Sequence, residues 1–129
     1  MKIKTIADSR AEHTQIVFSE HINGTGRLFG GRLVEWMDIV AAVVARRHSE
    51  CEVTTVSIES LNFAAPARLN DTLVIIGEMV SVGNTSMKVR VTVYVEKLSG
   101  ERQLINTAYF ILVALDKEDK PCRVCRLRE

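Results

Sequence analysis

The chain has 129 residues, 47% of them hydrophobic, and a formal net charge of +1. This length and hydrophobic content suffice for one globular domain with a sizeable core but not for two. The near-neutral charge argues against a general nucleic-acid or membrane surface, although the tail from about residue 117 is locally basic. We therefore expect one domain over residues 1–129, with no nucleic-acid or membrane partner.

The N-terminal residues and the cysteines both favour a cytoplasmic location. The chain starts without the apolar core of a signal peptide, and no apolar run approaches the roughly 20 residues that span a bilayer. Its three cysteines, Cys51, Cys122 and Cys125, are an odd number, which suits a reducing compartment. Cys122 and Cys125 form a CxxC, but no second pair stands at zinc spacing. We therefore expect no metal site and bystander cysteines in a solvated tail.

A short strand is expected around residues 12–18, where polar and β-branched residues mix. A loop with four glycines follows over residues 21–31. Glycine can adopt left-handed conformations and lets backbone amides approach a ligand closely. Gly30 and Gly31 end this loop, so we expect them at the N-terminus of the next helix.

One long helix is expected over residues 31–47, ending near Ser49. Before its closing arginines it has only three charged residues, Arg32, Glu35 and Asp38. Apolar residues occupy every side of the helical wheel, so we expect the helix to be buried. Asp38 shares its face with small side chains, which leave room for a partner backbone or a substrate. Burying an unpaired carboxylate is costly, so Asp38 should have a partner or a task.

The rest of the chain is predicted to form four strands. The first, over residues 53–63, changes its apolar phase near Ser60 and should bend or bulge there. After a loop over 64–71, strands follow over 72–82, 87–96 and 103–115, joined by turns at Gly83-Asn84 and Ser99-Gly100. This order requires an antiparallel sheet around one helix. One helix cannot cover a long sheet, so we expect association with a second copy.

Four segments of the chain carry a resemblance to a known family: HINGTGRLFGGRLVEWMD, VTTVSIESLNFAAP, VGNTS and FILVALD. Together they resemble the hotdog-fold acyl-CoA thioesterases (acyl-CoA hydrolases) over roughly residues 12–121. The resemblance implies an α+β hotdog fold, an antiparallel sheet wrapped around one long central helix. It implies a dimer, commonly assembled further into a hexamer as a trimer of dimers. It also implies hydrolysis of fatty acyl-CoA to free fatty acid and CoA, with no cofactor apart from the CoA of substrate and product.

The resemblance also assigns roles to residues of the loop and the helix. The family's catalytic aspartate falls on Asp38, as general base or nucleophile, and its catalytic asparagine on Asn23, with the two supplied by opposing subunits. Asp38 lies about 10 Å of helix rise beyond Gly31, so an asparagine before the same helix is poorly placed to reach it. The amides of Gly30 and Gly31, at the positive end of the helix, would stabilise an oxyanion.

The resemblance also implies that the turn between the strands predicted over residues 72–82 and 87–96 contacts the pantetheine or nucleotide of CoA. Its residues are Gly83, Asn84, Thr85 and Ser86, and an ordinary hairpin turn is an equal alternative for them. Asn84 replaces a frequent arginine of the family, which weakens the expectation of a CoA phosphate contact. Asn70 stands where a glycine is usual.

Two other functions remain as alternatives to a thioesterase. A non-catalytic acyl-CoA-binding or regulatory hotdog protein is disfavoured because the chain keeps Asn23 and Asp38 and has no helix-turn-helix pattern. A hotdog dehydratase or hydratase is disfavoured because no histidine is placed to pair with the aspartate. From the residues alone, a structural role for Asp38, as a paired carboxylate in the core, remains an open alternative to a catalytic role. We expect a structural role for His21 and a salt bridge for Glu35.

Overall fold

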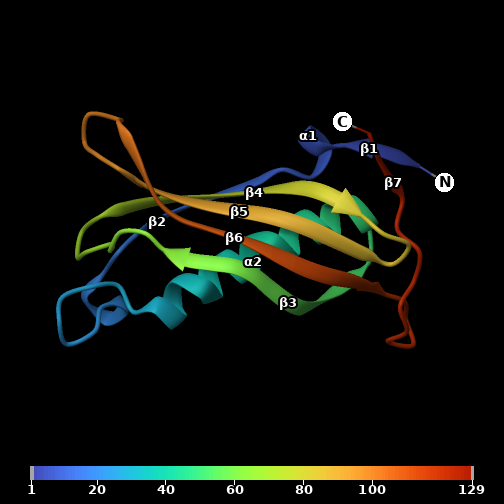
Figure 1. Cartoon of the computed structure of the whole chain (residues 1–129), viewed down its shortest axis with the longest axis horizontal. Coiled ribbons are helices and arrows are strands. Elements are labelled where there is room, and N and C mark those ends of the chain that lie inside the picture. The colour runs from blue at the N-terminus through green and yellow to red at the C-terminus, as the bar shows by residue number, and fades with distance from the viewer. Residues whose placement is uncertain (1, 129) are drawn as a thin grey trace.

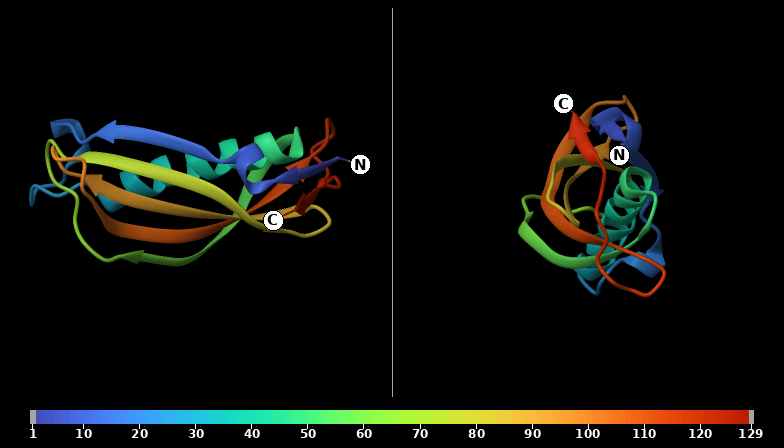
Figure 2. Two further views of the ribbon diagram at one scale, coloured as in Figure 1. Left: turned by 90° about the horizontal axis from the view of Figure 1, so that it is seen from above. Right: turned by 90° about the vertical axis from the view of Figure 1, so that its right-hand side faces the viewer.

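One long helix and a five-stranded antiparallel sheet form the body of the molecule (Figure 1). The computed structural model describes residues 2–128. The helix is α2 (Gly30–Ser49), and the sheet has the order β2–β4–β5–β6–β3. The strands are β2 (Ala11–Ile16), β3 (Glu52–Phe63), β4 (Thr72–Val82), β5 (Ser86–Glu96) and β6 (Arg102–Leu115). The sheet curves around the helix (Figure 2), so the expected α+β arrangement of a sheet wrapped around one helix is confirmed.

Close packing of α2 on the sheet depends on Gly77 of β4. A Cβ atom at Gly77 would lie 2.8 Å from Cγ1 of Val40 and 2.9 Å from Cγ2 of Val44. Glycine therefore allows an approach of helix and strand that a side chain would block. Met37 and Val44, which are fully buried, continue this contact along the inner face of the helix.

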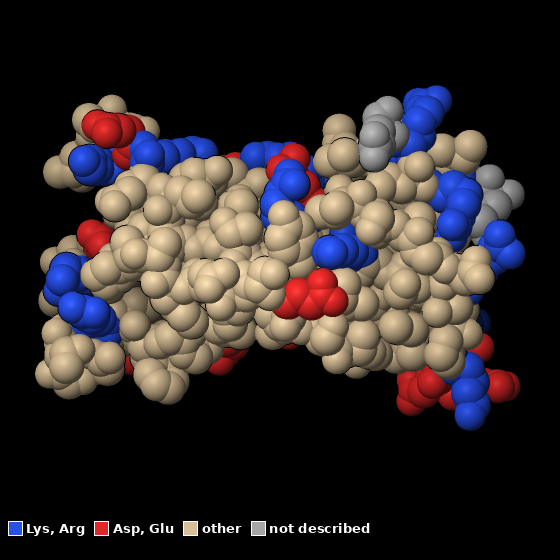
Figure 3. All heavy atoms as spheres, viewed as in Figure 1, with Lys and Arg blue, Asp and Glu red and all other residues tan. Residues whose placement is uncertain are grey.

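The expectation that α2 is buried on every side is wrong for the single chain. The sheet covers only one side of the helix, so Glu35 is exposed and Ile39 keeps 56% of its surface accessible. Val56 and Phe63 on the neighbouring edge strand β3 are also more than half exposed. The face seen in Figure 1 also has broad uncharged areas, between a central group of charged side chains and those at the two ends (Figure 3). The uncovered apolar surface expected from the sequence is thus present.

The turns and bulges follow the sequence pattern closely. Ser60 has a φ of 55° and lies within the register shift between Glu59 and Asn62, so the expected bulge in β3 is confirmed. A second register shift, between Thr55 and Ser57, was not expected. Asn70 has a φ of 71°, a left-handed conformation that asparagine tolerates better than most residues.

Four short elements were not expected: β1 (Ile3–Thr5), α1 (Ile6–Ser9), the 3-10 helix η1 (Ser19–His21) and β7 (Arg126–Arg128). β1 and β7 pair in parallel as a separate two-stranded sheet. The expectation of a solvated C-terminal tail is therefore wrong. Val124 in this tail is fully buried, and the backbone N–H of Cys122 donates to Ala114 O at 2.9 Å. The partner strand comes from the other end of the chain, which no local pattern reveals.

Candidate functional site

Asp38 lies in the middle of α2 and is half-buried, with its carboxylate directed toward β3. Its Oδ1 atom accepts a hydrogen bond from Oγ1 of Thr55 at 2.6 Å. Thr55 stands beside the first register shift of β3. A hydrogen bond of this kind fixes the orientation of the carboxylate. Asp38 thus has the partner that its place in an apolar helix predicted, and sequence reasoning did not single out that partner.

Asn23 lies in the glycine loop, where its side chain folds back onto the chain that follows. Oδ1 of Asn23 accepts hydrogen bonds from Thr25 N at 2.9 Å and Thr25 Oγ1 at 2.6 Å, which make an Asx turn. The backbone N–H of Asn23 donates to Arg27 O at 2.8 Å and closes the loop. With Oδ1 engaged, Nδ2 is the side-chain group left to donate, since it has no acceptor among residues 2–128.

The N-terminus of α2 offers free backbone donors. Phe29 is the N-cap residue, and it gives no side-chain hydrogen bond to the helix. Its carbonyl accepts from Arg32 N at 3.0 Å and Leu33 N at 3.2 Å, whereas the amides of Gly30 and Gly31 have no acceptor among the described residues. Such amides, at the positive end of a 20-residue helix, attract a developing negative charge.

A cavity of about 370 Å³ lies beside this helix end. Asn23 and Gly30 both line it, so the structure brings these two predicted site residues together. Its other walls come from the loop, from α2, and from the end of β3 and the chain that follows it: Arg27, Leu28, Leu33, Phe63, Ala64, Ala65, Pro66 and Ala67. Gly31 and Asp38 are not among its lining residues.

Asn23 and Asp38 therefore do not meet within one chain. Asp38 stands eight residues into the helix from Gly30, which corresponds to about 12 Å of helix rise. Asp38 bonds to β3, while the Asn23 side chain bonds to its own loop. This separation agrees with the expectation that one chain does not hold the pair together.

The turn of Gly83, Asn84, Thr85 and Ser86 lies at the other end of the molecule, between β4 and β5 (Figure 1). It is a hairpin turn, closed by a hydrogen bond from Gly83 N to Ser86 O at 2.9 Å. The C-terminal segment supports it, because Val124 N donates to Asn84 O at 2.9 Å and Nη2 of Arg126 donates to Gly83 O at 2.6 Å. A single chain thus keeps the turn far from the helix N-terminus.

His21 and Glu35 have the roles that the sequence predicted for them. Nδ1 of His21 accepts a hydrogen bond from Phe18 N at 3.0 Å, and the imidazole packs edge-on against Trp36 with ring centroids 4.9 Å apart. Glu35 forms an exposed ion pair with Arg32 at 3.8 Å. His21 therefore holds the loop against the helix, and Glu35 stays at the surface.

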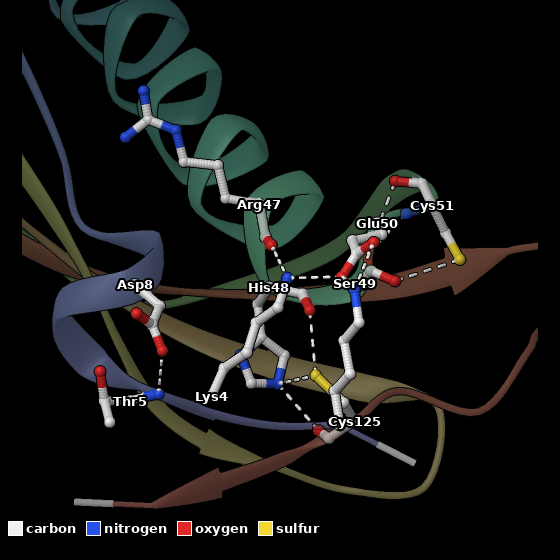
Figure 4. Close-up of polar contacts among 10 residues, drawn as sticks. Lys4, Thr5, Asp8, Arg47, His48, Ser49, Glu50, Cys51 and Cys125 are labelled. Atoms are coloured by element: carbon white, nitrogen blue, oxygen red, sulfur yellow. Dashed lines mark hydrogen bonds and ion pairs between the residues drawn. The ribbon is translucent and has the colours of Figure 1, made fainter.

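The C-terminal end of α2 carries a second cluster of polar contacts (Figure 4). Nζ of Lys4 donates to Arg47 O at 2.6 Å and lies 2.9 Å from the carboxylate of Glu50. The hydrogen bond from Lys4, then that from Lys2, lowers the pKa of Glu50 to about 2. The cluster joins the N-terminal strand to the end of the helix, and it gives no sign of chemistry.

Among residues 2–128 no three metal-binding side chains gather, and no helix is long and apolar enough to cross a membrane.

Comparisons with known proteins place the chain in a family. The family model described as the thioesterase superfamily matches residues 25–100. An uncharacterized acyl-CoA thioester hydrolase of Bacillus subtilis (strain 168) is 36% identical over 121 residues, which cover 93% of this chain and 70% of that protein.

Solved structures show the same fold. An acyl-CoA hydrolase from Staphylococcus aureus, in complex with butyryl coenzyme A, coenzyme A and coenzyme A disulfide, superposes with a TM-score of 0.96 and 29% identity, over 98% of this chain and 78% of that one. An apo-hexameric acyl-CoA thioesterase superposes with a TM-score of 0.95 and 32% identity, over 99% of this chain and 83% of that one.

Proposed function

Because the chain belongs to the thioesterase superfamily and has its hotdog fold, we propose that this thioester hydrolase converts fatty acyl-CoA to free fatty acid and CoA. The observation that carries the proposal is the carboxylate of Asp38 in a helix of apolar residues. Its Oδ1 accepts a hydrogen bond from Oγ1 of Thr55 at 2.6 Å. A second part of the site, with Asn23 and the free amide of Gly30, lines a cavity at the start of that helix.

The chemistry requires a base or nucleophile, donors for the oxyanion, and a leaving group. Asp38 either removes a proton from the attacking water or attacks the thioester carbonyl itself. The amide of Gly30 stabilises the negative charge that develops on the carbonyl oxygen, and Nδ2 of Asn23 orients the water or the carbonyl. CoA leaves as a thiolate, and because the pKa of a thiol is about 8.5 the leaving group needs no general acid.

We propose that each complete site is assembled from two chains, with Asp38 of one protomer and Asn23 of the partner subunit. The separation of the two residues within one chain supports this arrangement. So does the exposed apolar surface of α2 and β3, which a second copy would cover. The solved relative described as hexameric supports a trimer of such dimers.

Three variants of the Staphylococcus aureus hydrolase support the choice of residues. In these solved structures an asparagine, an aspartate or a threonine is replaced by alanine. The three residues follow one another along that chain at the same spacing as Asn23, Asp38 and Thr55 along this one.

Release of free CoA thiol from a panel of acyl-CoA esters of increasing chain length tests the activity. We expect thiol release that is proportional to enzyme and saturates with substrate, with the chain-length preference read from kcat/KM. A protein that binds the same esters, as measured by calorimetry, but releases no thiol would contradict the proposal and would identify a non-catalytic acyl-CoA-binding protein.

A further inference from the structure

The three cysteines of the chain lie where the C-terminal segment crosses the end of α2 and the beginning of β3. Cys51 directly precedes β3, and Cys122 and Cys125 lie between β6 and β7. All three are half-buried free thiols. The proposed hydrolysis uses none of them.

Cys51 and Cys122 are in direct contact although they are 71 residues apart in the sequence. The thiol of Cys122 donates to Sγ of Cys51 with a sulfur–sulfur distance of 3.6 Å. Their backbones are anchored by hydrogen bonds, from Cys122 N to Ala114 O at 2.9 Å and from Cys51 N to Ser49 Oγ at 3.1 Å. A disulfide has a sulfur–sulfur distance of about 2.05 Å, so a small side-chain movement brings the two atoms to bonding distance.

Cys125 has different surroundings, although it forms the CxxC with Cys122. Its Sγ donates to His48 O at 3.1 Å and lies 3.4 Å from Nε2 of His48. Nε2 of His48, which is fully buried, also lies 2.8 Å from Cys125 O. Figure 4 shows Cys125 turned toward His48 and away from Cys51. The CxxC spacing suggests a pair of Cys122 and Cys125, whereas the fold places Cys122 against Cys51.

We propose that Cys51 and Cys122 form a reversible disulfide when the protein meets hydrogen peroxide, and that this bond ties the C-terminal segment to the start of β3. The Cys51 sulfur attacks one peroxide oxygen, the O–O bond breaks, and a sulfenic acid and water result. The Cys122 sulfur then attacks the Cys51 sulfur, the S–O bond breaks, and a second water leaves as the disulfide forms. The two thiols lose two electrons in all, and the peroxide is reduced to two waters.

The surroundings of Cys122 support this order of steps. The thiol of Cys122 donates to Sγ of Cys51, and the thiol of Cys51 donates in turn to Ser49 O at 3.4 Å. Burial raises the pKa of the Cys122 thiol most, and the hydrogen bond with Cys51 raises it further. Because the thiolate is the form that reacts with peroxide, the raised pKa of Cys122 suits this thiol to the second step, in which it resolves the sulfenic acid.

The bond would fasten the segment that supports the turn of Gly83 to Ser86. Val124, two residues beyond Cys122, donates to Asn84 O, and Arg126 donates to Gly83 O. Any effect of oxidation on CoA binding rests on the proposed function of that turn. Formation of the disulfide does not depend on that function, so the disulfide and the CoA-binding role of the turn can be disproved separately.

Thiol counting and peptide mass spectrometry on the full chain test the proposal. The reduced protein is treated with hydrogen peroxide, and free thiols are then counted with an aromatic disulfide reagent under denaturing conditions. We expect a loss of two of the three thiols per chain, a peptide linked through Cys51 and Cys122, and full recovery with dithiothreitol. Cys51→Ser and Cys122→Ser should each abolish the linked peptide, whereas the matched control Cys125→Ser should keep it.

A second readout is independent of the variants. Closing a loop of this length restricts the unfolded chain, so oxidation should raise the midpoint of thermal unfolding by about 5–15 °C, and dithiothreitol should reverse the rise. Three free thiols after peroxide, a bond between Cys122 and Cys125, or a linked peptide that Cys125→Ser removes would each overturn the proposal.

Discussion

The carboxylate of Asp38 carries the proposed chemistry, and a substitution can remove its charge without changing its shape. We expect Asp38→Asn to lower kcat by at least ~100-fold, as the loss of a general base does, with little change in the affinity for acyl-CoA. Thiol-release kinetics together with binding calorimetry measure both quantities. Glu35→Gln is the matched control, since Glu35 is an exposed carboxylate one turn earlier on the same helix. Near-normal turnover in a folded Asp38→Asn protein would make Asp38 a structural carboxylate.

Thr55 positions that carboxylate through a single hydrogen bond of 2.6 Å. Loss of a hydrogen bond to a charged group costs about 1.5–3 kcal/mol, so we expect Thr55→Val to lower kcat by roughly 10-fold or more while KM changes little. Thr55→Ser keeps the hydroxyl and should restore most of the rate. Equal rates for the valine and serine variants would show that the hydroxyl does not position Asp38.

The sequence identified some of these residues and not others for a physical reason. Asp38 and the glycines at the helix N-terminus stand out because a charge in an apolar helix and a cluster of glycines are rare local patterns. Thr55 stands in a strand rich in β-branched residues, where one threonine resembles its neighbour Thr54. Only the alignment of β3 with α2 shows which of them faces Asp38, and that alignment is a tertiary feature.

Among the structural elements, α2 and β4 depend on their contact at Gly77. A methyl group there would meet Val40 and Val44 at 2.8 and 2.9 Å. We expect Gly77→Ala to lower the free energy of unfolding by about 1–3 kcal/mol, the usual cost of overpacking a core, as measured by urea denaturation. Gly24→Ala is the control, because a Cβ atom at Gly24 meets nothing within 4 Å. A Gly77→Ala protein as stable as this control would contradict the close contact of α2 and β4 at Gly77.

The ion cluster at the end of α2 predicts a specific acid sensitivity. The pKa of Glu50 is lowered from 4.5 to about 2 by Lys4 and Lys2, so its ionised form stabilises the folded chain. That contribution is fully present above pH 4.5 and is lost as the pH falls through about 2. We expect Glu50→Gln to be less stable than the wild type at pH 6, with the difference disappearing as the pH approaches 2. A difference that is constant across this range would contradict the role of the ion cluster.

The long elements were predictable and the short ones were not. The alternation along β5 and the apolar helix are strong periodic signals over ten or more residues. β1 and β7 have three residues each, too few for any period, and each is stabilised by a strand from the opposite end of the chain. The basic charge of the tail therefore suggested solvent exposure, although Val124 in that tail is fully buried.

At the scale of the whole molecule, one chain separates the parts of the proposed site. Asn23 and Gly30 share a cavity at one end of α2, Asp38 faces β3 farther along the helix, and the turn at Gly83 lies at the far end (Figures 1 and 2). Apolar side chains such as Ile39 and Val56 remain exposed between them. Both features were predictable in outline, because one helix is too small to cover a sheet of four long strands. The geometry of the interface was not, since it depends on contacts between chains.

The measurement that most directly tests the shared site is activity in mixed oligomers. Asn23→Ala and Asp38→Ala subunits, each nearly inactive alone, are co-expressed with two different tags, and the hybrids are isolated by both tags in turn. Each hybrid dimer would contain one site with both residues intact and one with neither. Random pairing makes about half of the dimers hybrid, so the unfractionated mixture should regain about a quarter of wild-type activity, and the isolated hybrids at least as much. Isolated hybrids that remain as inactive as the parent variants would contradict a site shared between two chains.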